Sequence, residues 1–382
     1  MANSKKKVVV LGSTGSIGVS TIKVADDLSE RIEIVGLGAH KSADKLLSQL
    51  SQTGARAVCL SDQDAAESII SDIPSGVDMF SGEEGLVELA TLEEADIVLI
   101  AIVGVAGLRP ALAALEAGKD LAVASKEILV MAGQAVMETA QRTGSKVLPV
   151  DSEHNAIFQC LEGKESDTVS RLILTASGGP FREYEREDLA NVSVDKALEH
   201  PTWDMGPKIT VDSATLFNKG LEMIEARWLF DIEMDRVDVI VHPQSIVHSM
   251  VEFIDGSVLA QLSVTDMCFP IQYALTWPDR VPNSLPPVDL AALGKLDFEK
   301  PRTEDFPALN LARQAGNSGG TLPAVMNAAN EIAVAQFLQG QLSFPGIWEH
   351  VESIMNDHNV IENPSIDELI EADRWARSFP IV

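Results

Sequence analysis

Two acidic side chains stand two positions apart where an apolar, strand-like run ends. The run covers residues 148–150 and is followed by Asp151 and Glu153. Side chains at i and i+2 share one face of an extended chain, so we expect both carboxylates to point the same way at a strand's carboxyl end. Open α/β sheets place their ligands at such ends, and paired carboxylates suit a hard divalent cation. Two acids that simply end a solvated strand are the alternative.

A second polar group follows helical spacing. Asn218 and Glu222 are four positions apart and Lys219 and Glu222 three, so all three can share one face of a helix within 210–225. A surface ion pair is the ordinary interpretation. The functional interpretation is that Glu222 adds a third carboxylate to the acidic pair, while Ser213, Asn218 and Lys219 bind an anion such as phosphate.

Glycines occupy the first turn of a predicted βαβ unit. A β-branched run at 7–11 leads into glycines at 12, 15 and 18, followed by a helical pattern over 19–28 and a strand-like segment over 32–37. Such a turn lets backbone N–H groups approach a pyrophosphate, whose charge the helix N-terminus stabilises. The spacing is GxxGxxG and not the commoner GxGxxG, so a plain turn stays an alternative.

The end of the second predicted strand bears on the choice of dinucleotide. A site for NAD would carry Asp or Glu there for the ribose hydroxyls. This chain has Gly38, His40 and Lys41, which favour the 2′-phosphate of NADP, although Lys41 could be an ordinary solvated lysine. Further strands over 95–101 and 121–124 and a helix over 110–116 continue a doubly wound pattern.

Polar residues follow two later segments. The strand at 121–124 is followed by Ser125, Lys126 and Glu127, where a nicotinamide could lie. A strand at 171–175 leads to Ser177, and residues 200–207 are too rich in Pro and Gly for regular structure. We expect a loop there, and its Trp and Met could either pack in the core or close over a substrate as a lid.

These patterns predict an α/β protein with a Rossmann-like doubly wound parallel sheet, a central α+β catalytic domain and a small helical domain at the C-terminus. Strands are expected over 237–241 and within 246–262, and helices near 307–316, 323–338, 345–355 and 366–375. The predicted domains are an NADPH-binding domain at 1–150 and a domain for catalysis and dimerisation at 151–275, with a flap at about 195–209. A Pro-rich linker is expected at 276–302 and the C-terminal helical domain at 303–382.

Composition excludes several classes of function. The 382 residues carry 57 acids against 29 bases, a formal charge of −28, which disfavours nucleic acids and anionic membranes as partners. An anionic substrate would need locally placed cations. The three cysteines are widely spaced and indicate neither a disulfide framework nor a thiolate zinc site. With no targeting pattern recognised, we expect a cytoplasmic protein.

Six segments in this order resemble the 1-deoxy-D-xylulose 5-phosphate reductoisomerase family. They are residues 12–18, 125–127, 149–155, 177–180, 200–206 and 212–225. The resemblance implies an enzyme, dependent on NADPH and on Mg2+, Mn2+ or Co2+, that rearranges and reduces 1-deoxy-D-xylulose 5-phosphate to 2-C-methyl-D-erythritol 4-phosphate in non-mevalonate isoprenoid synthesis. It also implies a homodimer that is sensitive to fosmidomycin-type hydroxamates.

The same resemblance implies roles at the substrate. The metal ligands would be Asp151, Glu153 and Glu222. The phosphate group would be bound by Ser177, Ser213, Asn218 and Lys219. The substrate hydroxyls and carbonyl would contact Ser152, Lys126 and His200, with Glu153 also a proton carrier, so that Lys126, Glu153 and His200 are the predicted catalytic residues. The flap over the substrate would contain Trp203 and Met205.

For the cofactor, the resemblance implies a pyrophosphate loop formed by Thr14, Gly15, Ser16 and Ile17. The other predicted cofactor contacts are Gly38, His40, Lys41, Ser125, Lys126, Glu127, Gly206 and Met267, the last two at the nicotinamide. The family pattern commonly has Asn before the Lys-Glu pair, where this chain has Ser125, and this difference bears on the strength of cofactor binding.

Three other functions fit parts of the pattern. Another Rossmann-type NADP-dependent oxidoreductase of a phosphorylated sugar would share the glycine turn but would not need three carboxylates with an anion site. A metal-dependent phosphosugar isomerase without redox chemistry would leave the glycine turn unexplained. A non-catalytic NADP sensor would need neither Glu222 nor Lys126, and both are present.

Overall fold

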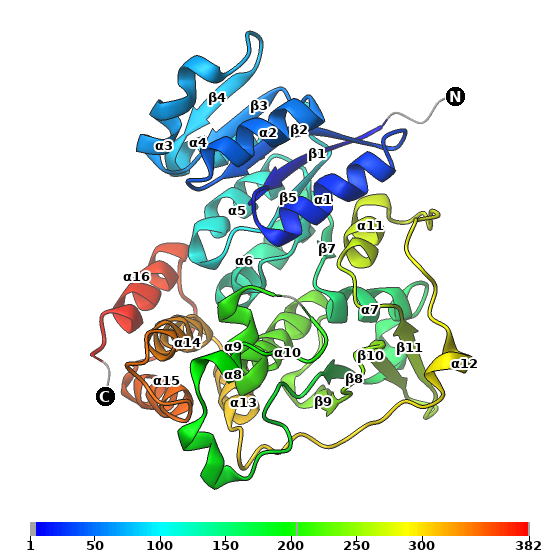
Figure 1. The fold of residues 1–382 in the computed structure, drawn as a ribbon, viewed down its shortest axis with the longest axis vertical. Helices are drawn as coiled ribbons and strands as arrows, with labels where there is room; N and C mark the ends of the chain where they lie inside the picture. The colour runs from blue at the N-terminus through cyan, green and yellow to red at the C-terminus, as the bar shows by residue number, and fades with distance from the viewer. Residues whose placement is uncertain (1–4, 204, 381–382) are drawn as a thin grey trace. The chain divides into compact units, whose positions relative to one another are not determined.

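The structure, a computed structural model, describes residues 5–203 and 205–380 (Figure 1). The chain forms two compact units. The first contains the chain up to residue 128 together with 134–155 and 266–286, and the second contains 129–133, 156–265 and 287–382. The four-part division expected from sequence stays a prediction, and its outer limits at 1–4 and 381–382 lie outside the described residues.

The first unit is built on a seven-stranded sheet in which every pairing is parallel. Its order is β4-β3-β2-β1-β5-β6-β7. The strands are β1 (Lys6–Leu11), β2 (Ile32–Ala39), β3 (Ala57–Leu60), β4 (Asp78–Ser81), β5 (Ile97–Ile100), β6 (Asp120–Val123) and β7 (Val147–Pro149). The doubly wound sheet is therefore confirmed. Because β1 lies between β2 and β5, the strand order reverses there, which is where such sheets bind ligands.

Helices connect these strands. They are α1 (Ser16–Asp27), α2 (Ala43–Thr53), α3 (Gln63–Ile69), α4 (Gly82–Ala90), α5 (Leu108–Glu116) and α6 (Lys126–Thr143). The later helix α11 (Cys268–Thr276) belongs to the same unit. Residues 8–11 of β1, all of β3 and β5, and residues 121–123 of β6 are apolar and almost completely buried, as expected for a parallel sheet covered on both faces. Helix α1 begins three residues earlier than expected, directly at the glycine turn.

The second unit contains a four-stranded mixed sheet in the order β11-β10-β8-β9. Its strands are β8 (Val169–Ala176), β9 (Val237–Val241), β10 (Val247–Phe253) and β11 (Val258–Leu262). Strand β10 is antiparallel to β8 and β11, whereas β9 is parallel to β8. The helices that accompany the sheet are α8 (Val194–Ala197), α9 (Pro207–Thr215) and α10 (Phe217–Leu229). Helix α7 (Ser152–Leu161) contributes residues to both units.

The C-terminal part is helical, as the sequence predicts. It contains α13 (Ala308–Ser318), α14 (Leu322–Leu338), α15 (Gly346–Asp357) and α16 (Ile366–Arg377). The Pro-rich segment before it holds one short helix, α12 (Leu290–Leu293). Shorter 3-10 turns occupy Ile70–Asp72, Gly104–Gly107, Ser166–Thr168, Arg186–Asn191 and Met234–Arg236. One hydrophobic core runs from β8 through α10 to α14 and α15, so these helices and the mixed sheet stabilise each other.

The structure corrects two local expectations. Strand β7 ends at Pro149 and α7 begins at Ser152, so Glu153 lies on the first turn of a helix and not on an extended strand. The segment 210–225 is not one helix, because Leu216 adopts a left-handed conformation with φ 68° that ends α9 before α10 begins. A non-glycine residue in this conformation is uncommon, and Leu216 is buried, which indicates that packing imposes the break.

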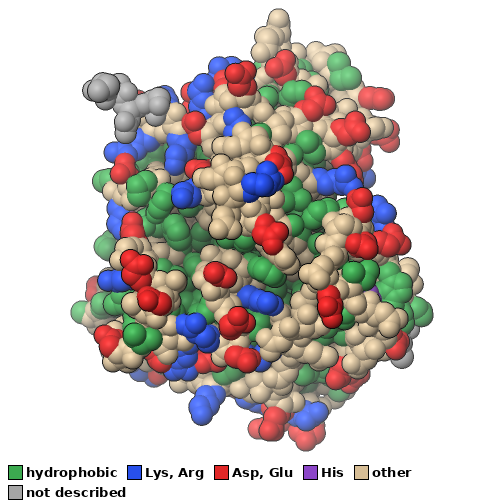
Figure 2. Space-filling model, turned by 180° about the vertical axis from the view of Figure 1, so that it is seen from behind, with side chains coloured by type: hydrophobic (Ala, Val, Ile, Leu, Met, Phe, Trp, Pro, Cys, Tyr) green, Lys and Arg blue, Asp and Glu red, His purple; other side chains and the backbone are tan. Residues whose placement is uncertain are grey.

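Acidic and basic side chains are interspersed over the face drawn in Figure 2, without one large cationic patch. The described residues include no helix that is both long and apolar enough to cross a membrane.

Helix α10 packs closely on α13 at Gly220. A Cβ added at Gly220 would lie 2.8 Å from Ala312 Cβ and 3.2 Å from the Ala308 carbonyl oxygen. We expect Gly220→Ala to lower the free energy of unfolding by about 1–3 kcal/mol, because these neighbours are short or belong to the backbone and cannot move aside. Urea denaturation of the variant measures this.

Gly316→Ala in α13 is the matched control. Its added Cβ would meet the flexible side chain of Met234, which can rotate away, and alanine has the higher helix propensity. The control should therefore lose clearly less stability than Gly220→Ala. Equal losses in the two variants would contradict the close packing of α10 on α13.

Candidate active site

The glycine turn after β1 is shaped by close packing of the chain on itself. Gly12 has φ 89°, and a Cβ there would lie 2.3 Å from the Ala101 carbonyl oxygen. A Cβ at Gly18 would lie 2.4 Å from the Gly12 carbonyl oxygen. At Gly15 the nearest atom would be 3.4 Å away, and Gly15 is exposed. Two glycines are thus required by packing, and the middle one leaves the turn open.

The first turn of α1 is free to bind an anion. Gly15 is the N-cap and provides no side-chain cap, and the first turn carries no acidic residue. The first N–H groups of a helix have no partner within the helix and carry partial positive charge. The predicted loop of Thr14, Gly15, Ser16 and Ile17 therefore fits the pyrophosphate of a dinucleotide.

The turn is bonded to the end of β2, where the adenosine part of a dinucleotide is expected. Backbone N–H groups of Gly12 and Ser13 donate to the Gly38 carbonyl at 2.8 and 2.9 Å. Beside it, His40 Nδ1 lies 2.9 Å from Ser61 Oγ, and the exposed Lys41 ammonium lies 3.3 Å from an Asp62 carboxylate oxygen. These polar groups at one edge of the sheet are compatible with the predicted NADP preference.

Sequence reasoning missed two side chains that shape this turn. Lys45 Nζ donates to the Thr14 carbonyl at 2.7 Å, and the buried Gln49 donates to the Ser13 carbonyl at 2.8 Å. Both come from α2. Their spacing of four residues indicates one helix face, but no local signal connects that face with the glycine turn.

A buried lysine faces the first acidic ligand candidate. Lys126 begins α6 after β6, and its Nζ lies 2.5 Å from Asp151 Oδ2, with only 8% and 12% of the two side chains exposed. The preceding Ser125 donates its hydroxyl to the Ile102 carbonyl at 2.5 Å. Glu127 is also buried. The structure therefore brings together the polar residues that follow β6 and β7, as parallel strands require.

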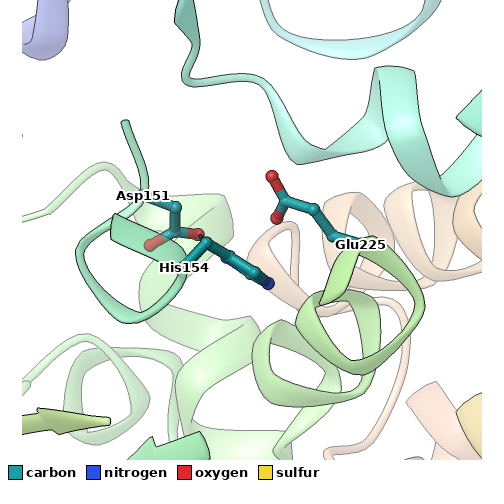
Figure 3. A group of neighbouring side chains, drawn as sticks. All are labelled: Asp151, His154 and Glu225. Atoms are coloured by element: carbon teal, nitrogen blue, oxygen red, sulfur yellow. Dashed lines mark ion pairs between the residues drawn. The ribbon is translucent and has the colours of Figure 1, made fainter. Parts of the chain in front are cut away.

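The start of α7 orients the acidic segment (Figure 3). Ser152 Oγ donates to Glu153 Oε2 at 2.7 Å, and His154 Nδ1 lies 4.0 Å from Asp151 Oδ2. The buried Asn155 amide donates to the carbonyls of Pro149 and Pro270 at 2.8 and 3.2 Å. This amide fixes the first turn of α7, which explains why the acids follow helical and not extended geometry.

In the second unit, three side chains from separate segments meet. His200 Nε2 lies 2.9 Å from Ser177 Oγ and 3.0 Å from Ser213 Oγ, and the two hydroxyls are 3.4 Å apart. Ser177 follows β8, His200 lies in the predicted flap between α8 and α9, and Ser213 lies on α9. The contact between Ser177 and Ser213 agrees with the prediction that both belong to one phosphate-binding set of residues. His200 lies beside these two serines.

The His200 ring is held as a neutral hydrogen-bond donor. Its Nδ1 accepts the backbone N–H groups of Trp203 and Thr202 at 2.9 and 3.3 Å, so the ring proton belongs on Nε2, facing the two serines. Burial lowers the pKa of His200 to about 4, because the charged form loses its hydration. A ring that is neutral at pH 7 donates one hydrogen bond and adds no positive charge.

Glycines after β8 permit this meeting. Gly178 and Gly179 have φ values of 83° and 68°, and a Cβ at Gly179 would lie 2.7 Å from Ala214 Cα. The Gly179 N–H donates to Ser177 Oγ at 3.2 Å. The loop therefore lies directly against the backbone of α9, beside Ser213.

Helix α10 presents the second polar group on one face, as predicted. Asn218 Nδ2 donates to Glu222 Oε1 at 2.6 Å, and Lys219 forms an ion pair with Glu222 Oε2. Lys219 is 5% exposed and Glu222 is fully buried, which excludes the ordinary surface ion pair. Glu225, also fully buried, follows on the same helix (Figure 3).

The predicted flap is a loop between α8 and α9, although both short helices fall partly within 195–209. The Trp203 ring packs edge-on to His248, with ring centroids 6.1 Å apart. Met205 is half-buried, Gly206 is exposed with open space around its Cα, and Asp204 lies outside the described residues. Met267, at the start of α11 in the first unit, is half-buried.

The predicted metal ligands are divided between the units. Asp151 and Glu153 belong to the first unit and Glu222 to the second. Within their own unit, Asp151 and Glu222 are each paired with a lysine. Glu153 accepts a hydrogen bond from the Ser152 hydroxyl. Carboxylate oxygens are the donors that hard divalent cations prefer, so the set fits Mg2+ or Mn2+ chemically.

Comparison with protein-family models finds three matches. Residues 8–133 match the model described as 1-deoxy-D-xylulose 5-phosphate reductoisomerase. Residues 147–230 match the C-terminal domain model of the same name, and 262–379 match the model described as DXP reductoisomerase C-terminal domain.

Curated relatives match over nearly their full length. The 1-deoxy-D-xylulose 5-phosphate reductoisomerase of Pelotomaculum thermopropionicum is 50% identical over 378 residues, covering 98% of each chain. The protein of the same name from Thermoanaerobacter pseudethanolicus is 50% identical over 370 residues, covering 97% of each.

Solved structures agree with this result. The reductoisomerase from Zymomonas mobilis in complex with NADPH is 42% identical, with a TM-score of 0.90, over 98% of this chain and 97% of that one. A DOX-P reductoisomerase in complex with NADPH, fosmidomycin and magnesium is 39% identical, with a TM-score of 0.92, over 97% and 96%. Since relatives at about half identity match along almost its whole length, this chain belongs to the 1-deoxy-D-xylulose 5-phosphate reductoisomerase family.

Proposed function

We propose that this chain converts 1-deoxy-D-xylulose 5-phosphate to 2-C-methyl-D-erythritol 4-phosphate, using NADPH and a divalent cation, in non-mevalonate isoprenoid synthesis. The observation that carries the proposal is the full-length match to reductoisomerases. The matched segments 8–133 and 147–230 include the glycine turn, Lys126, the acidic segment and the polar face of α10. A structural relative described with NADPH, fosmidomycin and magnesium supports the same cofactors.

We infer that Asp151, Glu153 and Glu222 are the metal ligands. Three carboxylates repel one another, and Lys126 and Lys219 each place a positive charge on one of them. When bound, the cation polarises substrate oxygens as a Lewis acid. Lys126 and the Ser152 hydroxyl are suited to orient the substrate carbonyl and hydroxyls, and Glu153 is suited to carry a proton.

Ser177, Ser213, Asn218 and Lys219 are proposed to bind the substrate phosphate. Two hydroxyls, one amide and one ammonium supply several donors but only one full positive charge, because His200 is neutral at pH 7. In a chain of net charge −28, this buried lysine would provide the local attraction that a phosphate monoester needs. His200 Nε2–H then orients the serine hydroxyls or the substrate itself.

The first unit is proposed to bind NADPH through the turn at 14–17 and the edge formed by Gly38, His40 and Lys41. Ser125, Glu127, Gly206 and Met267 remain proposed contacts of the nicotinamide half. The cofactor supplies the hydride, while the protein positions it. Trp203 and Met205 are proposed to cover the substrate, because apolar side chains over a reacting group exclude water.

We also propose that the protein is a homodimer that forms through the surface around β11. In the described chain, β11 pairs only with β10, so one edge of the mixed sheet is left unpaired. Ile254, Val258 and Leu259 near this edge are 72%, 46% and 42% exposed. An apolar, unpaired strand edge is a surface that another chain readily covers.

A cytoplasmic location is proposed as well. It is supported by the three cysteines, which are free thiols buried in the structure, as is usual in a reducing compartment.

The first test follows NADPH oxidation by the purified protein with 1-deoxy-D-xylulose 5-phosphate and Mg2+ or Mn2+. We expect oxidation that needs the metal and stops with fosmidomycin, and a loss of more than about 100-fold in turnover for Glu222→Gln, because a metal ligand is removed. NADPH binding should be unchanged. Glu331→Gln, which removes a different carboxylate of the second unit that pairs with Arg377, is the control and should retain turnover. Full activity of Glu222→Gln would remove Glu222 from the metal site.

The phosphate assignment is tested with Lys219→Ala. Loss of a charge-assisted hydrogen bond costs about 1.5–3 kcal/mol, so we expect KM for the phosphorylated substrate to rise about 10- to 150-fold while KM for NADPH stays constant. Steady-state kinetics measure both constants, and Lys164→Ala, at an exposed lysine, is the control. An unchanged substrate KM in Lys219→Ala would exclude Lys219 from phosphate binding.

The dimer surface is tested with Leu259→Lys. A charge on the apolar edge should weaken association, so we expect the variant to shift from dimer to monomer in light scattering coupled to size exclusion. Val360→Lys, at an exposed apolar residue of the second unit away from β11 in the chain, should remain dimeric. A monomeric wild-type protein at micromolar concentration, or a Leu259→Lys variant that stays dimeric, would argue against this surface.

A further inference from the structure

Asp212 is a buried carboxylate with two partners from different helices. Only 1% of the residue is exposed. Its Oδ2 lies 2.8 Å from Lys208 Nζ, one turn earlier on α9, and its Oδ1 accepts a hydrogen bond of 2.8 Å from Asn330 Nδ2 on α14. Burying an ionised group is costly unless it is paired and hydrogen-bonded, so these partners hold Asp212 in one place.

Asn330 ties α9 to the best-buried helix of the C-terminal part. It is fully buried and lies 118 positions from Asp212 in the chain. Helix α14 is itself held in place, because Glu331 pairs with Arg377 of α16 at 2.7 Å. Asp212 is thus bonded to a helix of the hydrophobic core and not to a loop.

The residue that follows Asp212 is Ser213, whose hydroxyl faces His200 and Ser177. Beyond it, Leu216 joins α9 to α10, which carries Asn218 and Lys219. Rotating or sliding α9 would therefore move the Ser213 hydroxyl away from its partners. A shift of this kind matters, because a hydrogen bond to a ligand weakens steeply as its distance and angle depart from the favourable range.

We propose that the Asp212–Asn330 hydrogen bond positions α9 so that Ser213 joins the group that binds the phosphate monoester of the substrate. Asp212 and Asn330 are positioning residues that act through Ser213 and do not contact the substrate. The inference rests on the proposed function, since it deepens the phosphate assignment. It also gives the C-terminal helices a role in substrate affinity in addition to their part in the hydrophobic core.

The test compares two substitutions in one helix. Asn330→Ala removes the bond to Asp212, whereas Asn327→Ala removes an equally buried amide one turn away that bonds to Glu331 and not to α9. We expect Asn330→Ala to raise KM for 1-deoxy-D-xylulose 5-phosphate about tenfold, equivalent to about 1.4 kcal/mol, with kcat within about twofold and KM for NADPH unchanged. Asn327→Ala should leave the substrate KM near the wild-type value.

Two further measurements separate positioning from lost stability. Inhibition by inorganic phosphate should weaken by a similar factor in Asn330→Ala, because both ligands use the same hydroxyls. If Asn330→Ala does not fold, Asn330→Leu, which keeps the side-chain volume but has no donor for Asp212, should give the same change in KM.

Two outcomes separate a failure of the proposed function from a failure of the positioning role. A wild-type protein that binds NADPH but does not oxidise it with this substrate would contradict the proposed function. An active wild type in which Lys219→Ala raises the substrate KM while Asn330→Ala and Asn327→Ala behave alike would overturn the positioning role alone.

Discussion

The buried ion pair between Lys219 and Glu222 is the constraint around which the second unit is arranged. Taking both charges out of water costs several kcal/mol per ion, which close pairing and the Asn218 amide offset in part. The pair stays buried because α10 lies in the hydrophobic core that also contains α13 and α14. Close packing at Gly220 and the left-handed break at Leu216 fix where this helix begins and which face it presents.

The first unit also holds a buried pair of a lysine and a carboxylate, positioned by different elements. Lys126 and Asp151 come after neighbouring parallel strands, so their side chains meet at one edge of the sheet. The glycine turn after β1 lies in the same sheet, at the reversal of strand order. A parallel sheet collects the loops that follow its strands at one edge, which is why residues far apart in sequence can serve one cofactor and one substrate.

The proposed phosphate site relies on neutral donors more than on positive charge. The chain carries 28 net negative charges, yet the polar group on α9 and α10 contains one buried lysine, one amide and two hydroxyls. His200 adds a directed hydrogen bond but no charge, since its Nδ1 is occupied by two backbone donors and burial keeps the pKa of the ring low. Neutral donors held in place can bind a phosphate oxygen without attracting every anion in solution.

Local patterns in the sequence determined the parts of this protein that depend on neighbouring residues. The glycine turn, the alternating strands and helices, the four C-terminal helices and the shared face of Asn218, Lys219 and Glu222 all follow from spacing and periodicity. Tertiary structure decided the rest. The helical start at Ser152 depends on an Asn155 contact with Pro270, and the break at Leu216 depends on packing. The meeting of His200 with two serines and the bond from Asn330 to Asp212 join segments separated by up to 118 positions. No local periodicity encodes such contacts, because they form only when the whole chain buries its apolar surface.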